Sequence, residues 1–206
     1  PSHRWSVENK LATQVPQLRI EALIATGEYF DAKRIDLVNC ETSKEMKSDK
    51  LAPGMSLTLK TTNEKVPATV EPAMELVVKN DGKSRKDASW CSLVRTFDKP
   101  LNLDDRQAIG VWVCGDGNGQ VIDFRLETEA GFAEFRSSHL IKIDFTGWKY
   151  FVLVESESTR MSDYYWPKSF GYYVYNHHIG RADYRTIKQF QLWCNNVPAG
   201  RECRVL

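Results

Sequence analysis

The feature that most constrains this chain is a glycine-rich centre flanked by two alternating runs, IGVWVCGDGNGQVIDFRL, over residues 109–126. Before the centre, Val111 and Val113 alternate with a tryptophan and a cysteine; after it, apolar side chains alternate with Asp123 and Arg125. Successive side chains of a β-strand point to opposite faces of the sheet, so a period of two predicts a strand on each side of the centre. Glycines supply the positive φ angles of tight turns. We therefore predict a β-hairpin over residues 109–126.

Two other roles of the glycine-rich centre fit the sequence less well. A phosphate-binding loop is followed by a helix, and the Walker type also needs a Lys-Ser/Thr pair; here a strand pattern follows. A calcium loop needs more oxygen ligands than Asp116 and Asn118, including a distal acidic side chain. The pattern therefore favours a turn over either ligand site.

Strand-like runs separated by turn residues dominate the chain after residue 50, and Ser6–Val15 is the one fair helix candidate. Many short strands with frequent turns are typical of an all-β sandwich or barrel. We expect a single domain over residues 1–206, in which residues 1–16 form a leader, a linker or a first helix. The predicted strands are Met55–Lys60, Met74–Asn80, Trp90–Phe97, Ala108–Cys114, Gln120–Thr128, Leu140–Phe145, Tyr150–Val154, Tyr172–Tyr175 and Phe190–Asn195.

Length, charge and cysteine spacing narrow the classes of function. The chain has 206 residues and a formal net charge of +1, which provides no long-range field for nucleic acid or an anionic membrane. No stretch of the sequence approaches the ~20 apolar residues of a membrane span. The five cysteines are odd in number and have no CxxC spacing, so we expect mostly reduced thiols and no zinc site.

Catalytic motifs are not visible in the sequence. No GxSxG or HExxH motif occurs. The neighbouring His177 and His178 would point in opposite directions in an extended segment, with no third metal ligand nearby. Adjacent Asp104 and Asp105 precede a strand, where they are typical of a turn or a cap. We therefore assign no catalytic residues and no metal ligands.

One face of the predicted sheet combines aromatic and charged side chains. If Ile122 and Phe124 point into a core, Asp123 and Arg125 lie on the opposite face. Indole rings stack on the apolar CH face of a sugar, and charged groups bind its hydroxyls. The alternative is that the tryptophans pack beneath a loop while Asp123 and Arg125 form an ordinary ion pair. The residues placed on this outer face are Glu75, Trp112, Asp123, Arg125, Gln191 and Trp193.

A second aromatic concentration is Tyr164, Tyr165 and Trp166, which follows a polar run and therefore begins in a loop. Large aromatic side chains on a loop must either be buried by the fold or contact a ligand. The sequence leaves both interpretations open. In one, Trp166 plugs the end of the sandwich; in the other, the three rings form a binding platform.

Several motifs together resemble the galactose-binding-like jelly-roll domains that accompany bacterial glycoside hydrolases and other polysaccharide-degrading proteins. The resemblance spans about residues 70–206 and rests mostly on motifs that determine the fold. Another strand after residue 206 belongs to that pattern, so we expect the chain to be truncated from a longer protein. The motifs are PAMELVV at 72–78, WCSLVRTF at 90–97, PLNL at 100–103, the run at 109–126, IDFTGWKYF at 143–151 and LWCNNVPAG at 192–200.

The resemblance implies a jelly-roll β-sandwich that acts as a non-catalytic carbohydrate-binding module. Its partners would be a polysaccharide or oligosaccharide and a catalytic domain of the same chain, in a secreted or cell-surface protein. Structural calcium is frequent in such modules, and no ligands are assigned here. The alternatives are an interaction domain docking within a larger protein and a small jelly-roll lyase or hydrolase. The predicted sugar-binding residues are Trp112, Asp123, Arg125 and Trp193 on the sheet face and Tyr164, Tyr165 and Trp166 in the loop.

Overall fold

The computed structural model describes residues 35–67, 71–106, 108–128, 136–153, 164–166 and 184–206. The chain divides into two compact units, residues 1–36 and 37–206. The description below concerns the second unit. The helix predicted at Ser6–Val15, the strand predicted at Tyr172–Tyr175 and the pair His177–His178 all lie outside the described residues.

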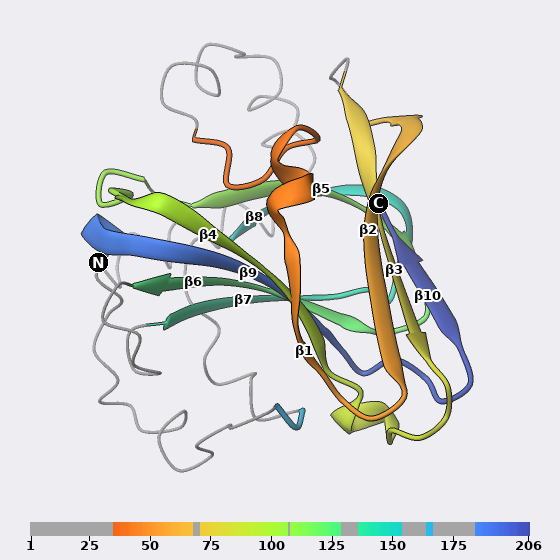
Figure 1. Ribbon diagram of the computed structural model, residues 1–206. Helices are drawn as coiled ribbons and strands as arrows, with labels where there is room; N and C mark the ends of the chain where they lie inside the picture. The colour runs from red at the N-terminus through yellow and green to blue at the C-terminus, as the bar shows by residue number, and fades with distance from the viewer. Residues whose placement is uncertain (1–34, 68–70, 107, 129–135, 154–163, 167–183) are drawn as a thin grey trace, which may run out of the picture. The chain divides into compact units, whose positions relative to one another are not determined.

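Antiparallel strands dominate the described part of residues 37–206 (Figure 1), which confirms the all-β prediction. In that part, no helix is long and apolar enough to cross a membrane. The elements are η1 (Thr42–Glu45), β1 (Lys47–Leu51), β2 (Met55–Lys65), β3 (Pro72–Asn80), η2 (Lys86–Ala88), β4 (Cys91–Leu101), β5 (Ile109–Asp116), β6 (Val121–Thr128), β7 (Arg136–Lys142), β8 (Thr146–Leu153), η5 (Tyr184–Thr186), β9 (Ile187–Asn195) and β10 (Glu202–Val205).

The strands form two layers. The first is a five-stranded sheet in the order β1-β4-β9-β6-β7. The second is assembled from a three-stranded sheet, β10-β3-β2, and a two-stranded sheet, β5-β8. Backbone hydrogen bonds join these two pieces, because Cys114 and Leu206 exchange N–H···O bonds of 2.8 and 3.2 Å. The resulting order in the second layer is β2-β3-β10-β5-β8.

One hydrophobic core lies between the layers and receives side chains from both. Leu76, Val78 and Val113 come from the second layer, and Phe124 and Phe190 from the first. The rings of Phe124 and Phe190 are stacked with centroids 6.1 Å apart. Burying apolar side chains from two packed sheets supplies most of the stability of such a sandwich. The side chains that alternate with these core residues must point away from the core, so each layer also has an outer face.

The hairpin predicted over residues 109–126 is wrong. β5 pairs with β8, whereas β6 pairs with β7 and β9, so the glycine-rich centre carries the chain from one layer to the other. The positive φ angles are present, at 74° for Gly117 and 79° for Gly119. Two alternating runs around a turn establish two strands, but they do not determine whether those strands pair with each other or face each other across a core.

Strand boundaries differ from prediction at several places: β2 and β4 continue beyond the predicted ends, to Lys65 and Leu101, and the region of β7 and β8 is divided differently. The strand predicted at Leu140–Phe145 is β7, which ends at Lys142; the strand predicted at Tyr150–Val154 is β8, which already begins at Thr146. β1 and β10 were not predicted. Their sequences, KSDKL and ECRV, are short and mostly polar, so neither shows an alternation long enough to detect. The five cysteines are free, as expected.

Asp116 fastens the connection between β5 and β6. Its carboxylate accepts the side-chain amide of Gln120 at 2.8 Å and the backbone N–H groups of Asn118 at 3.1 Å and Arg204 at 2.7 Å. Burial by itself would raise the pKa of Asp116, but these hydrogen bonds outweigh it and hold the pKa below its usual value. The contact with Arg204 ties the connection to β10.

We expect Asp116→Ala to lower the free energy of unfolding by about 1–2 kcal/mol near neutral pH, because several donors lose their acceptor. Since the folded-state pKa is lowered, the stabilisation is present above the unfolded-state value and is lost as pH falls through the folded-state value. Urea unfolding of wild type and variant between pH 7 and 2 should therefore show the two curves converging below about pH 4. A difference that stays constant down to pH 2 would contradict this role of Asp116.

Candidate functional site

The outer face of the first layer brings together three of the predicted site residues. Trp193 of β9 lies directly opposite Asp123 of β6, and Arg125 follows two residues later on the same face. Phe124, between them, points into the core. The alternation read from the sequence therefore places Asp123, Arg125 and Trp193 correctly on one face.

Trp166 joins this group from the described segment 164–166. The guanidinium of Arg125 lies 4.3 Å from the ring centroid of Trp193 and 4.6 Å from that of Trp166. The two indoles meet edge to face, with centroids 5.9 Å apart and an interplanar angle of 83°. A cation over an aromatic ring is attracted by the negative charge density of the ring face. We call Arg125, Trp166 and Trp193 the arginine–tryptophan stack.

Asp123 holds the arginine of the stack in place. Its carboxylate accepts a hydrogen bond from Nε of Arg125 and another, at 3.0 Å, from the backbone N–H of His139 on β7. Both charged side chains are buried, with Asp123 0% and Arg125 4% exposed. A buried ion pair is tolerated only when it is well paired and hydrogen-bonded, and here the geometry meets that condition.

The stack is sealed from solvent. Trp193 is 1% exposed and Trp166 is 5% exposed. The two rings and the charged pair are therefore occupied by each other, and direct stacking of a sugar on them does not fit this structure. Packing beneath a loop, the alternative that the sequence left open for Trp193, describes that residue. Trp166, for which the alternative was a plug at the end of the sandwich, is buried against Trp193 on the outer face of the first layer. Together the two rings hold segment 164–166 in place.

Tyr165 points the other way and is 60% exposed. Its backbone is fixed on both sides, since its N–H donates to the carbonyl of Asp87 at 2.9 Å and its carbonyl accepts Nδ2 of Asn195 at 2.7 Å. Tyr164 is half-buried and meets Trp166 edge-on at 6.4 Å. Segment 164–166 thus anchors one ring inward and presents another outward.

A charged pair from the connection between β3 and β4 lies at the exposed ring. The guanidinium of Arg85 lies 5.2 Å from the Tyr165 centroid and binds both carboxylate oxygens of Asp87, at 2.7 and 3.1 Å. Hydrogen bonds to Asp87 and then to Tyr165 raise the pKa of Arg85, and the hydrogen bond from Arg85 lowers the pKa of Asp87. The result is an exposed aromatic ring with a guanidinium over it and a carboxylate bound to that guanidinium, and aromatic and charged groups together are the chemistry a sugar requires.

Trp112 and Glu75 do not belong to this face, contrary to the prediction. Trp112 lies on β5 and Glu75 on β3, both in the second layer. An alternating pattern shows which side chains of one strand share a face, but it does not show which sheet the strand joins. Trp112 is therefore separated from Asp123 by the core.

Gln191, which the sequence placed on this face, belongs to a chain of polar side chains beside the stack whose other members, Glu127 and Gln189, were not predicted there. Nε1 of Trp193 donates to Oε1 of Gln191 at 2.9 Å, and Nε2 of Gln191 donates to Glu127 and, at 3.1 Å, to Gln189. These residues continue the period-two positions of β6 and β9, so the pattern contained the signal. Arg85, Asp87 and Asn195 carry no comparable signal, because their approach to Tyr165 depends on loop packing.

Among the described residues, no group of three or more His, Cys, Asp and Glu side chains is arranged to hold a metal ion. Within the glycine-rich connection, Asp116 is engaged by Asn118, whose Nδ2 lies 2.8 Å from its Oδ2. The structural calcium expected from the resemblance stays without assigned ligands.

Comparison with known proteins gives matches among solved structures alone, since no family model and no curated protein matches the chain. A family 11 carbohydrate-binding module from Clostridium thermocellum, in complex with a β-1,3-1,4-mixed-linked tetrasaccharide, is 13% identical with a TM-score of 0.48, covering 78% of this chain and 85% of that one. The family 11 module of the cellulase Lic26A-Cel5E of the same organism is 12% identical with a TM-score of 0.46, covering 85% and 86%.

An exo-β-agarase is 10% identical with a TM-score of 0.44, and this chain spans only 23% of its length. The agarase AgWH50C is 8% identical with a TM-score of 0.44, and there the chain spans 22%. The set therefore includes carbohydrate-binding modules, the class that the sequence resembles, and larger enzymes of which this chain spans less than a quarter. At these TM-scores the correspondence is loose, and function has to be argued from the residues of this chain.

We expect Arg125→Met to lower the free energy of unfolding by about 3–5 kcal/mol, because it leaves the Asp123 carboxylate buried without its cation. The matched control is Arg204→Met, which removes an arginine whose side chain is 58% exposed and should cost at most about 1 kcal/mol. Urea unfolding followed by tryptophan fluorescence measures both. Equal losses in the two variants would show that the stack adds nothing beyond an ordinary surface ion pair.

Proposed function

We propose that this chain is a non-catalytic carbohydrate-binding domain whose ligand stacks on Tyr165. The observation that carries the proposal is the orientation of segment 164–166, where a sealed tryptophan fixes an outward tyrosine. A ring 60% exposed would lose apolar contact with water by covering a sugar face. Arg85 and Asp87 stand ready to bind hydroxyl groups at the edge of the sugar ring.

The backbone of Tyr165 is held in place before any ligand binds, and this favours a role in recognition over accidental exposure of the ring. The backbone of Tyr165 is held by Asp87 and Asn195, and the next residue is locked in the stack. A ring that is already fixed loses little conformational entropy when it binds, so more of the stacking energy appears as affinity. Three contacts hold this segment: the two backbone hydrogen bonds of Tyr165 and the cation–π contact of Trp166. A surface tyrosine without a function would not need them.

The biological role that follows is to hold an attached polysaccharide-degrading domain near its substrate. The chain would then be part of a secreted or cell-surface protein, and the catalytic residues would lie outside it. Linking a binding module to an enzyme raises the effective concentration of substrate at the active site. Binding should not depend on added calcium, because no calcium ligand is part of the proposed site.

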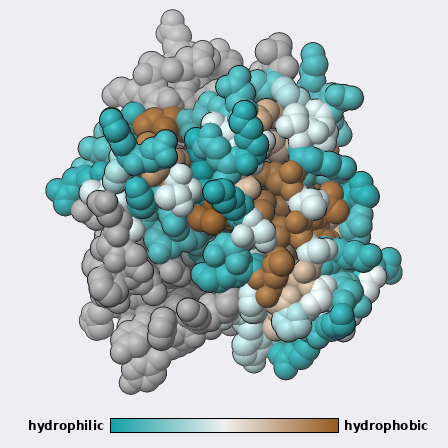
Figure 2. Space-filling view, in the orientation of Figure 1, coloured by the Kyte–Doolittle hydropathy of each residue, from teal (hydrophilic) through white to brown (hydrophobic). Residues whose placement is uncertain are grey.

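A second candidate is an interaction domain that docks within a larger protein. Figure 2 shows an apolar area in the part of the view where β1 and β2 run. Leu57 and Leu59 of β2 and Met46 before β1 are half-buried at the border of the core. Exposed apolar area of this kind is typical of contact surfaces between proteins, so a docking role competes with sugar binding.

Affinity electrophoresis tests the proposal. Native gels containing neutral polysaccharides (mixed-linkage β-glucan, agarose, xylan) or acidic ones (alginate, dextran sulfate) should retard the wild type in at least one case. Tyr165→Ala should weaken that retardation about tenfold in affinity, equivalent to about 1.4 kcal/mol. The matched control is Leu51→Ala, which truncates a side chain 44% exposed on β1 and should leave retardation unchanged.

Two results would overturn the proposal. If none of these polysaccharides retards the wild type, the chain does not act as a carbohydrate-binding domain and the docking role gains support. Release of new reducing or unsaturated ends by the chain alone would show catalysis instead.

A further inference from the structure

A second group of aromatic side chains lies on the outer face of the other layer. Val113 of β5 points into the core, so Trp112 and Cys114 on either side of it point outward. The antiparallel register places Tyr150 of β8 opposite Trp112 and Trp148 opposite Cys114. Two adjacent strands therefore carry three aromatic rings at neighbouring outward positions. We call Trp112, Trp148 and Tyr150 the β5–β8 platform.

Tyr150 lies across the sheet instead of standing upright on it. A side-chain carbon added at Gly110 would come within 2.3 Å of the Tyr150 hydroxyl oxygen, so the ring occupies the space above this glycine. The rings of Tyr150 and Trp112 are 5.2 Å apart with an interplanar angle of 51°. Gly110 thus permits a low aromatic surface where any other residue would push the tyrosine away.

The platform is accessible in a way that the arginine–tryptophan stack is not. Trp112, Trp148 and Tyr150 are each partly exposed, and Val152, the next outward residue of β8, is 47% exposed. Three partly exposed rings on neighbouring strands leave apolar area that a ligand can cover. Packing requirements explain buried rings such as Trp193, but they do not explain rings on an outward face.

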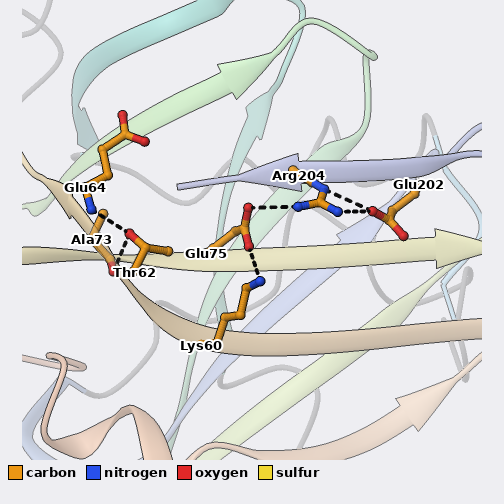
Figure 3. A network of polar contacts seen from close by, with 7 residues as sticks. All are labelled: Lys60, Thr62, Glu64, Ala73, Glu75, Glu202 and Arg204. Carbon is orange, nitrogen blue, oxygen red and sulfur yellow. Dashed lines mark hydrogen bonds and ion pairs between the residues drawn. The ribbon is translucent and has the colours of Figure 1, made fainter.

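Charged side chains share the outer face of this layer. Figure 3 shows Glu75 of β3 accepting from Lys60 of β2 at 2.8 Å and from Arg204 of β10 at 3.4 Å. Arg204 also binds Glu202 at 2.7 Å. These residues alternate with core residues such as Leu76, so they point the same way as the platform.

The charged side chains of this layer continue onto β5, the strand that carries Trp112. Asp116 follows two residues after Cys114 on the same strand. On this face the carboxylates of Glu75, Asp116 and Glu202 are matched in number by the cations of Lys60, Lys79 and Arg204, and Lys79 lies directly opposite Glu202. Such a face has no excess of positive charge that would attract an anionic ligand.

We propose that the β5–β8 platform is a second carbohydrate-binding surface, selective for neutral over sulfated or uronic glycans. This inference rests on the proposed function and adds a second sugar-binding site to the one at Tyr165. Flat aromatic surface takes the CH faces of consecutive sugar units, and the carboxylates accept hydrogen bonds from their hydroxyls. The two sites lie on opposite layers with the core between them, so one short oligosaccharide cannot touch both. The domain is therefore bivalent and cross-links long polysaccharide chains.

The test compares three variants with the wild type: Tyr165→Ala, the platform variant Trp112→Ala/Trp148→Ala, and their combination. Thr58→Ala, exposed on β2 of the same layer, is the control. Mixed-linkage β-glucan and agarose serve as neutral probes and dextran sulfate as the anionic probe. Retardation in native gels reports binding, and light scattering with the neutral polysaccharides in solution reports cross-linking.

The wild type should be retarded by a neutral polysaccharide and should produce scattering. Tyr165→Ala and the platform variant should each abolish scattering while keeping retardation weakened about tenfold, and the combination should lose both. If the platform variant scatters and binds like the wild type, the second site is wrong although the proposed function stands. If no neutral polysaccharide retards the wild type, the second site is wrong; if no acidic polysaccharide retards it either, the proposed function is wrong too.

Protection of Cys114 supplies a measurement that does not depend on the variants folding. Its thiol lies on the platform between Trp112 and the strand carrying Trp148. A neutral polysaccharide should slow its alkylation by iodoacetamide, measured by peptide mass spectrometry, several-fold relative to Cys40, which lies outside the platform. Equal rates with and without the polysaccharide would overturn the proposal.

Discussion

A guanidinium held between two indole rings organises the outer face of the first layer. Without Arg125, Asp123 would be a buried carboxylate with no compensating charge. Without the two indole rings, the guanidinium of Arg125 would lose the cation–π attraction that holds it between them. Because Trp166 belongs to a segment far from β6 in sequence, this contact also decides where segment 164–166 lies. The direction of Tyr165 follows from it.

This arrangement separates support from recognition. Trp193 and Trp166 were two of the predicted sugar-binding residues, and they instead pack against each other between the sheet and segment 164–166. The proposed ligand contacts are instead Tyr165, the exposed neighbour of Trp166, and the rings around Trp112 in the other layer. The large apolar area of an indole suits it to either task, and only the layer arrangement distinguishes the two.

Much of the fold could be predicted from the sequence, because a period of two requires one face of each strand to be buried. β2, β3, β4, β5, β6 and β9 were found in this way, as was the shared face of Asp123 and Arg125. Which strands pair with each other could not be predicted. Residues 115–119 connect two layers rather than two paired strands, and β5 places Trp112 in the layer opposite Asp123. Those outcomes depend on long-range contacts between layers, which local alternation does not encode.

The central claim is that Arg125 serves recognition only by positioning Tyr165. A double-mutant cycle for neutral-polysaccharide affinity, measured on variants confirmed to be folded, tests it most directly. The account predicts that Arg125→Met weakens binding when Tyr165 is present and has no further effect in the Tyr165→Ala background. Additive losses would show that Arg125 acts independently of the tyrosine and would contradict the account.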